Sequence, residues 1–229
     1  MTIIKYEMNR NIDIQFKDGT IIHNTCYDSF KKGNIKNYNY PDIYGVGYFG
    51  YGKYSYKEHT IVYNTWMNML KRCYDLKYQE NKPTYLNCVV CKEWHNFQNF
   101  ADWYEKSYYS IPNCKMQLDK DILVKGNKIY SLENCCFVPS EINAVFTKRE
   151  AERGNLPIGV NEVKGRYKAC FTRNKQITYL GYYDTPLEAF QIYKFAKEQY
   201  IKLLANKYIK YLPNNLYNAL MNYQVEIDD

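Results

Sequence analysis

Two aspartates and an asparagine flank one short segment of the chain and could bind a cation together. In the segment QLDKDILVKGNKIYSLENCCFVP, residues 117–139, Asp119 and Asp121 stand at one end and Asn134 near the other. The residues between them predict two short apolar strands joined by a turn at 126–128. Carboxylate and carboxamide oxygens are ligands of hard divalent cations such as Mg²⁺. On spacing alone, however, the pattern favours an ordinary strand end with solvated charges and a turn asparagine.

Four of the eight cysteines raise the question of a zinc site. Cys88 and Cys91 form a Cys-x-x-Cys pair, and Cys135 and Cys136 follow later in the chain. A second Cys-x-x-Cys pair is missing, and adjacent residues on a strand point to opposite faces of the sheet. We therefore expect buried, reduced thiols and no zinc.

Basic residues gather in the last third of the chain. The formal net charge is +7, and residues 157–210 hold ten Lys or Arg against four Asp or Glu. Such a concentration favours a polyanionic partner, with a solvated basic face as the alternative. The sequence has no apolar run of membrane-spanning length and no signal-peptide pattern. We therefore expect a cytoplasmic protein without a membrane partner.

The first half of the chain predicts a β-rich segment followed by helices. Residues 1–57 contain a predicted hairpin, IDIQFKDGTII, around an Asp-Gly turn. The run YGVGYFGYGKYSY, residues 44–56, favours a structural hairpin with aromatic packing over a binding loop. Apolar residues at helical spacing predict helices at 60–74 and about 93–108. The second helix carries the expected core residues Trp94, Phe97, Phe100 and Trp103.

The second half predicts a short helix, a linker and a three-stranded sheet followed by a helix. The short helix begins at Ser140, and the charged run TKREAERGN, residues 147–155, makes the best linker in the chain. The expected strands are 158–163, 166–173 and 176–182. The following helix begins with a capping box, in which Thr185 is the N-cap, Pro186 the first residue and Glu188 the third.

Alternation along the middle strand of this sheet separates its residues into two faces. Positions 167, 169 and 171 can pack on the helix. The outward set is Lys168, Cys170 and Thr172, with Arg173 beside them at the turn. A sheet with a basic and polar outer face suits DNA, because β-strands can enter the major groove.

The segment from Ile158 to Lys197 resembles the AP2/ERF-type DNA-binding domain. The landmarks, in order, are Gly159-Val160, Gly165-Arg166-Tyr167-Lys168-Ala169, Tyr179-Leu180-Gly181-Tyr182-Tyr183, Asp184-Thr185, Glu188-Ala189, Tyr193 and Ala196. The landmarks occupy these 40 residues, and the resemblance as a whole covers about 50. It implies that the outward face of the sheet binds double-stranded DNA.

The base-reading positions of that family differ here. Its arginines are replaced by Asn161, Val163, Thr172 and Ile177, and only Tyr179 keeps the aromatic character of its position. Asn161, Thr172 and Tyr179 remain expected DNA contacts, but sequence preference cannot be carried over. We expect contacts to phosphate to dominate, and such contacts weaken steeply with salt. The expected phosphate-binding residues are Lys164, Arg166, Lys168, Arg173 and Lys175. A module that binds protein is the alternative.

Three segments resemble HNH endonucleases of the phage homing type, in which a two-stranded hairpin and a helix hold one divalent metal. They are YNTWMNMLKRCYD, VCKEWHNFQNFADW and the run from Leu118 to Asn143. The resemblance implies Mg²⁺ bound by Asp119 and Asn134 against the scissile phosphate. Folding of the hairpin can bring both residues to one metal. An HNH-like core followed by an AP2-like module recurs in phage proteins.

Lys120 replaces the general-base histidine of that family. A lysine would need its pKa lowered by about three units to act as a base at neutral pH, at roughly 4 kcal/mol. We therefore expect Lys120 to hold phosphate and either Asp121 or a distant histidine to be the catalytic base. Of His23, His59 and His95, the last is the first candidate.

These features predict an α+β protein of phage origin. The expected parts are a β-rich segment at 1–57, an HNH-like ββα core with flanking helices at 58–147, an AP2-like sheet and helix at 155–212, and a tail at 213–229. The leading hypothesis is a Mg²⁺-dependent DNA endonuclease or nickase. Replacement of the histidine leaves two alternatives: a catalytically inactive DNA-binding regulator, and an anti-CRISPR-like inhibitor of a host defence complex.

Overall fold

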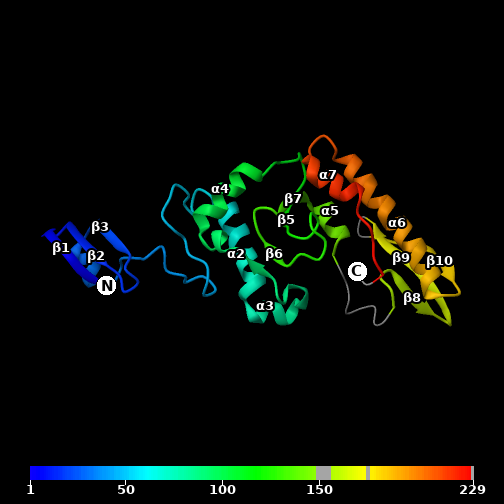
Figure 1. Cartoon of the computed structure of the whole chain (residues 1–229), viewed down its shortest axis with the longest axis horizontal. Helices are drawn as coiled ribbons and strands as arrows, with labels where there is room; N and C mark the ends of the chain where they lie inside the picture. The colour runs from blue at the N-terminus through cyan, green and yellow to red at the C-terminus, as the bar shows by residue number, and fades with distance from the viewer. Residues whose placement is uncertain (148–155, 174–175, 228–229) are drawn as a thin grey trace. The chain divides into compact units, whose positions relative to one another are not determined.

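The structure, a computed structural model, describes residues 1–147, 156–173 and 176–227. The chain divides into two compact units, which we call unit 1 (Met1–Lys106) and unit 2 (Ser107–Asp229). Helices and small sheets occur in both (Figure 1). The expected mixture of α and β structure is therefore confirmed.

The boundary between the units crosses the predicted core at 58–147, so the hairpin segment 117–139 belongs to unit 2 together with the C-terminal sheet. Residues 148–155 of the predicted linker lie outside the described residues, and so does Lys175. No helix in the described ranges has both the length and the apolar character that crossing a membrane requires.

Unit 1 begins with a three-stranded antiparallel sheet in the order β1-β2-β3. Its strands are β1 (Thr2–Met8), β2 (Asn11–Gln15) and β3 (Ile21–Thr25), and a short helix α1 (Tyr27–Lys31) follows. The predicted hairpin around Asp18-Gly19 is confirmed, with Ile12 and Ile14 fully buried. Within residues 32–57, all of which are described, the only strand pairing is an isolated bridge between Ile43 and Gly47 and another between Tyr48 and Asn96.

The helical part of unit 1 packs around aromatic side chains. Its elements are α2 (Thr60–Tyr74), α3 (Leu76–Asn81), η1 (Pro83–Tyr85), β4 (Val89–Val90), η2 (Lys92–His95) and α4 (Phe97–Ser107). The predicted helix at 60–74 is confirmed, whereas the one at 93–108 is interrupted at Asn96, whose Oδ1 accepts the N–H of Gln98. The four expected core residues are all buried. The indole Nε1 of Trp66 donates to the carbonyl of Trp94 at 2.7 Å.

Unit 2 contains a strand pair that departs from the predicted hairpin. Its elements are β5 (Met116–Asp119), β6 (Ile129–Tyr130), β7 (Cys136–Pro139) and α5 (Ser140–Val145). Strands β5 and β7 are antiparallel, with Met116 opposite Pro139 and Asp119 opposite Cys136. The prediction of two strands meeting at the 126–128 turn is wrong, because pairing between β5 and β7 stops at Asp119 and residues 120–135 form a loop that is regular only at β6. The helix predicted at Ser140 is confirmed.

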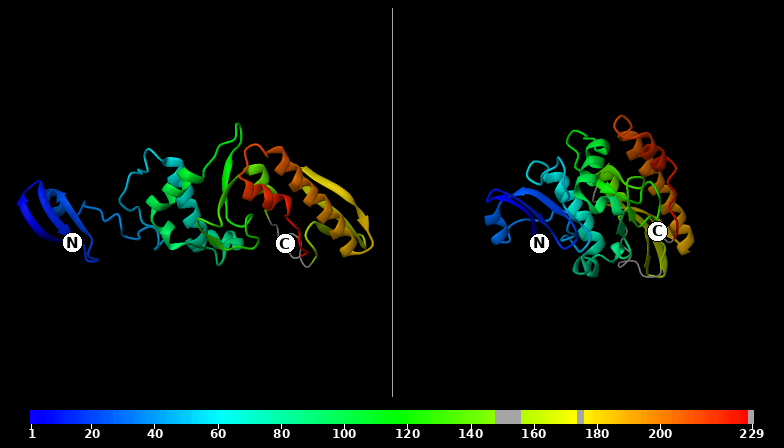
Figure 2. Two further views of the ribbon diagram at one scale, coloured as in Figure 1. Left: turned by 45° about the horizontal axis from the view of Figure 1, so that its top comes forward. Right: turned by 60° about the vertical axis from the view of Figure 1, so that its left-hand side comes forward.

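The C-terminal sheet and its helix follow the predicted pattern. Three antiparallel strands lie in the order β10-β9-β8 and one long helix packs on them (Figure 2). They are β8 (Val160–Val163), β9 (Arg166–Arg173), β10 (Gln176–Tyr183) and α6 (Pro186–Lys207). The capping box is confirmed: Thr185 Oγ1 accepts the N–H of Glu188 at 3.2 Å, and Glu188 Oε2 accepts the N–H of Thr185 at 3.1 Å. A Cβ at Gly159 would lie 2.0 Å from Tyr193, so only glycine lets β8 approach α6 this closely.

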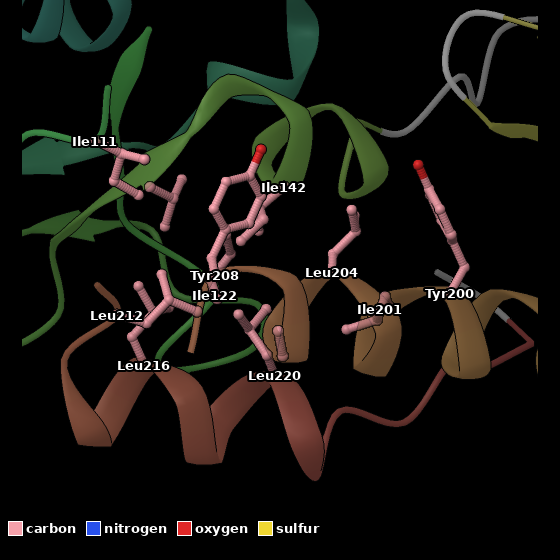
Figure 3. Packing of buried hydrophobic residues seen from close by; sticks show 12 residues of the cluster. Ile111, Ile122, Ile142, Tyr200, Ile201, Leu204, Tyr208, Leu212, Leu216 and Leu220 are labelled. Atoms are coloured by element: carbon pink, nitrogen blue, oxygen red, sulfur yellow. The ribbon is translucent and has the colours of Figure 1, made fainter. Parts of the chain in front are cut away.

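Helix α6 is shared by two hydrophobic cores. Its first half packs on the sheet through Phe190 and Tyr193, as the alternation predicts. Its second half packs against the β5–β7 region and α7 (Asn214–Met221), a helix the sequence analysis did not predict (Figure 3). This second core, the α6–hairpin core, contains Ile111, Ile122, Val138, Ile142, Tyr200, Ile201, Leu204, Ala205, Tyr208, Leu212, Leu216 and Leu220. The strand pair and the sheet are therefore parts of one packed body.

The predicted tail at 213–229 is also built into unit 2. Val225 is fully buried in the core between the sheet and α6. Its N–H donates to Glu198 Oε1 at 2.9 Å, and its carbonyl accepts from Lys194 Nζ. These contacts hold the segment around Val225 against α6.

Truncation of Leu204 should weaken both halves of unit 2. Leu204 is 2% exposed in the α6–hairpin core, so Leu204→Ala should cost about 2–5 kcal/mol of unfolding free energy. The matched control is Leu203→Ala, at a neighbouring residue that is 48% exposed, where we expect a change within about 0.5 kcal/mol. Hydrogen exchange should show protection falling together in β5, β7 and α6. A loss confined to α6 would contradict the shared core.

Candidate functional site

Asp119 ends strand β5 and starts the loop. Its Oδ1 accepts two main-chain N–H groups, from Asp121 at 2.9 Å and from Ile122 at 2.8 Å. Such side-chain-to-backbone bonds compete with the ladder of a sheet, which explains why pairing stops here although an apolar run follows. The same turn carries Ile122 into the α6–hairpin core. Both of these bonds are made to Oδ1.

The ammonium group of Lys120 closes this loop from inside. Lys120 is 7% exposed, and its Nζ donates to Asp121 Oδ2 at 3.0 Å and to the carbonyl of Asn127 at 2.9 Å. The same atom lies 6.0 Å from the ring centroid of Tyr130. A buried charge requires such partners, because leaving water is otherwise costly. The side chain that was expected on phosphate is therefore turned into the protein.

Asn127 connects the two candidate metal ligands. Its Nδ2 donates to the carbonyl of Lys120 at 2.7 Å, and its Oδ1 accepts from Asn134 Nδ2 at 3.2 Å. Two hydrogen bonds thus lead from Asn134 to the residue next to Asp119. Asn134 lies two residues before Cys136, the residue that pairs with Asp119. The structure therefore brings all three oxygen-bearing residues to one end of the ladder.

The sequence pattern places Asn127 only in a turn and does not predict these longer-range bonds. Its amide also donates to the carbonyl of Ile129 and accepts that residue's N–H. An Asn-centred turn was a visible signal, but the identity of the long-range partner was not. The donation from Asn134 Nδ2 leaves the carboxamide oxygen of Asn134 without a donor among the described residues.

Negative charge is concentrated and partly desolvated at this end of the ladder. Burial, followed by repulsion from Asp121, raises the pKa of Asp119 to about 6, while the two N–H bonds act in the opposite direction. Burial and then Asp119 raise the pKa of Cys136 as well. A carboxyl group in this state gains from a cation that replaces its proton.

The donor atoms suit a hard cation better than zinc. Among the described residues no group of three or more His, Cys, Asp or Glu is placed to hold a metal. Mg²⁺ is commonly bound through one or two protein oxygens and completes its shell with water and phosphate. Asp119 and Asn134 fit that pattern. All eight cysteines are free thiols.

His95, the candidate base, belongs to unit 1. It ends η2, and its Nε2 lies 3.4 Å from the hydroxyl of Tyr74. That hydroxyl also accepts the N–H of Val90 at 3.0 Å. The three histidines all precede residue 107, so the sequence of unit 2 contains none. Asp121, with a side chain that is 43% exposed, is the candidate base inside unit 2.

The outer face of the C-terminal sheet matches the predicted alternation. Lys168, Cys170 and Thr172 lie opposite the helix-packed face. Asn161 pairs with Lys168, and its Nδ2 lies 3.4 Å from Cys170 Sγ. Lys168 Nζ lies 5.2 Å from the ring centroid of Tyr179, which is 68% exposed. A lysine and an exposed ring thus stand together on a surface that a nucleic acid could approach.

Arg173 does not lie beside the outward set, and that prediction is wrong. Alternation places it on the same side as Phe171, and its guanidinium lies 5.1 Å from the ring centroid of Tyr200 on α6. A cation–π contact of this kind holds it toward the helix. Arg166 does lie outward but bonds to Asp184 at 3.2 Å.

Two further positions complete the outer face. Lys164, exposed in the turn between β8 and β9, has a left-handed φ of 52°. Tyr182, 51% exposed, pairs with Lys168 after a bulge between Tyr179 and Gly181. The sequence analysis missed Tyr182 as a surface residue of this face, because a bulge shifts the alternation.

No protein-family model, curated protein or solved structure matches this chain. The resemblances to HNH endonucleases and to AP2/ERF-type domains therefore stay predictions.

Replacing Asp119 with Asn should stabilise unit 2 near neutral pH but not in acid. The fold raises the pKa of Asp119 from 3.8 to about 6, so the unfolded chain ionises first. The free energy of unfolding of the wild-type protein therefore falls as the pH rises from the ordinary pKa of 3.8 to the raised pKa of about 6. It stays constant above that range. An asparagine avoids the loss and can still accept both N–H bonds. We expect a gain of about 1–3 kcal/mol at neutral pH.

Urea unfolding followed by far-UV circular dichroism measures this gain. All three tryptophans lie in unit 1, so their fluorescence reports that unit separately and should not change. If Asp119→Asn raised the free energy of unfolding by the same amount at a pH well below the ordinary pKa of an aspartate, the electrostatic cause would be refuted.

Proposed function

We propose that the chain is a DNA endonuclease or nickase that uses a divalent metal. The observation that carries the proposal is the placement of Asp119 and Asn134 at one end of the β5–β7 ladder, where Asn127 bonds both to Asn134 and to the carbonyl of Lys120, the residue next to Asp119. The main-chain bonds to Asp119 use Oδ1, and Asn134 bonds to Asn127 through its Nδ2 rather than its oxygen. The raised pKa of Asp119 supports a site that gains from a cation.

Four residues would have distinct roles in the reaction. Asp119 and Asn134 would hold Mg²⁺, which when bound supplies Lewis-acid activation of a phosphate oxygen. Asp121, next to the site and partly exposed, would accept the proton of the attacking water. Lys120 keeps the loop closed through Asp121 and Asn127 and so positions both ligands.

The sheet would hold the DNA duplex in a fixed relation to this site. Lys168 and Tyr179 offer a charge and an exposed ring on the outer face. Helix α6 packs on the other face of the sheet and also in the α6–hairpin core. A duplex on the sheet would therefore be presented to the loop by one packed body.

A DNA-binding regulator without cleavage is the second candidate. Two observations favour it: Lys120 is buried and already bonded, and the sequence of unit 2 contains no histidine. A site without an efficient base could still bind metal and DNA. Activity measurements separate the two candidates.

Supercoiled plasmid should be nicked by the wild-type protein with Mg²⁺ and not with EDTA. Asp119→Ala and Asn134→Ala each remove one ligand and should lower the rate by at least about 100-fold. The matched control is Glu133→Gln, which neutralises an exposed carboxylate in the same loop and should leave the rate unchanged.

Retained nicking by Asp119→Ala would exclude this metal site. Absence of nicking by the wild-type protein, with duplex binding intact, would favour the regulator.

Duplex binding should depend on the outer face of the sheet and on salt. Lys168→Gln removes a phosphate contact, so it should weaken binding and reduce the slope of log affinity against log salt by about one. Tyr179→Ala should weaken binding with little change in slope. Lys210→Gln makes the same charge change at an exposed residue beyond α6 and serves as the control. Gel shifts in a salt series measure both quantities, and equal loss in the control would refute the sheet as the DNA surface.

A further inference from the structure

Unit 1 contains a cavity that none of the sites above uses. Its volume is about 930 Å³, and residues of the first hairpin, the Gly/Tyr run and α2 line it. This size falls at the upper end of the range for pockets that bind small molecules or single nucleotides.

Aromatic rings dominate the wall of this cavity. Tyr38 contacts Phe49 at 5.6 Å and Tyr51 at 5.5 Å between ring centroids, and Phe49 contacts Tyr56 at 6.3 Å. Tyr38, Tyr51 and Tyr56 remain between 44% and 55% exposed, and Tyr40, also in the lining, is 59% exposed. Exposed tyrosine faces are the surfaces on which unpaired bases stack.

The aromatic wall is held rigidly from behind. Gln98 is buried, accepts the N–H of Tyr54 at 3.0 Å, and donates to the carbonyls of Phe49 at 3.3 Å and Tyr54 at 3.0 Å. A Cβ at Gly52 would lie 2.4 Å from Gln98 Oε1. Because Gly52 has no Cβ, Gln98 can approach and hold the backbone of the Gly/Tyr run. Neighbouring tyrosines of the run line the cavity. A preformed wall lowers the ordering cost of binding.

Lysines supply positive charge at the rim. Lys17 and Lys36 are exposed and have no ion pair within the described residues, whereas Lys53 pairs with Glu105 at 3.1 Å. Two carboxylates also line the cavity. Asp18 is bonded to Thr20 and Asn37, and Asp42 is exposed. The rim therefore offers two uncommitted cations to a phosphate chain whose bases enter between the rings.

We propose that this cavity binds unpaired nucleotides of single-stranded DNA, with bases stacked on Tyr40 and Tyr51 and phosphates near Lys17 and Lys36. The choice of DNA over RNA rests on the proposed function, but the stacking site does not. A strand separated from its complement would be one source of such nucleotides.

Fluorescence anisotropy of the intact protein with fluorescein-labelled oligothymidylate tests the proposal. Tyr40→Ala should weaken binding roughly 5- to 10-fold, whereas Tyr40→Phe keeps the ring and should bind as wild type. Lys36→Gln should weaken binding and reduce its salt dependence. Tyr211→Ala, at a tyrosine of unit 2 that is 47% exposed, is the control and should have no effect.

A second measurement locates the strand directly. Photocrosslinking of a bromodeoxyuridine oligonucleotide should label peptides that contain residues 38–56. Equal affinity of Tyr40→Ala and wild type, no binding by wild type, or crosslinks confined to unit 2 would overturn the proposal. Tighter binding of oligouridylate would overturn the assignment to DNA. Duplex binding and nicking involve Lys168 and Asp119, so their failure would leave this result unaffected.

Discussion

The arrangement of the candidate site depends on one partly buried carboxylate that two main-chain N–H groups hold in place. Asp119 ends strand β5 by bonding to Asp121 and Ile122. The loop that follows then directs Lys120 inward, where Asp121 and Asn127 satisfy its charge. The same arrangement keeps an ionised group in a setting that raises its pKa. Binding of a cation would relieve this cost, which is the basis of the proposed metal site.

Helix α6 connects this local arrangement to the C-terminal sheet. It is a 22-residue helix, and its two halves pack in different cores. A sheet with a short helix alone would leave the β5–β7 pair to move independently. Because α6 continues into the α6–hairpin core, displacement of the sheet must be transmitted to the loop that carries Asn134. The coupling is a packing effect and needs no direct bond between the outer face and the site.

Local sequence patterns predicted the elements well and their partners less well. The capping box at Thr185, the helix at 60–74 and the two faces of β9 follow from signals within a few residues. The prediction of the strand pairing is wrong because the hydrogen bonds from main-chain N–H groups to Asp119 outweigh the β-propensity of Ile122, Leu123 and Val124. The inward turn of Lys120 and of Arg173 depends on partners distant in the fold, Asn127 and Tyr200. Charged residues are expected at the surface until such partners are known.

The central claim is that Asp119 and Asn134 share one divalent cation. Crystals of the protein soaked with Mn²⁺, a substitute for Mg²⁺ with anomalous scattering, test it most directly. The account predicts an anomalous peak within coordination distance of Asp119 Oδ2 and Asn134 Oδ1, and its loss in Asp119→Asn crystals. A well-ordered loop without a peak there, or with both side chains directed away from a peak elsewhere, would contradict the claim.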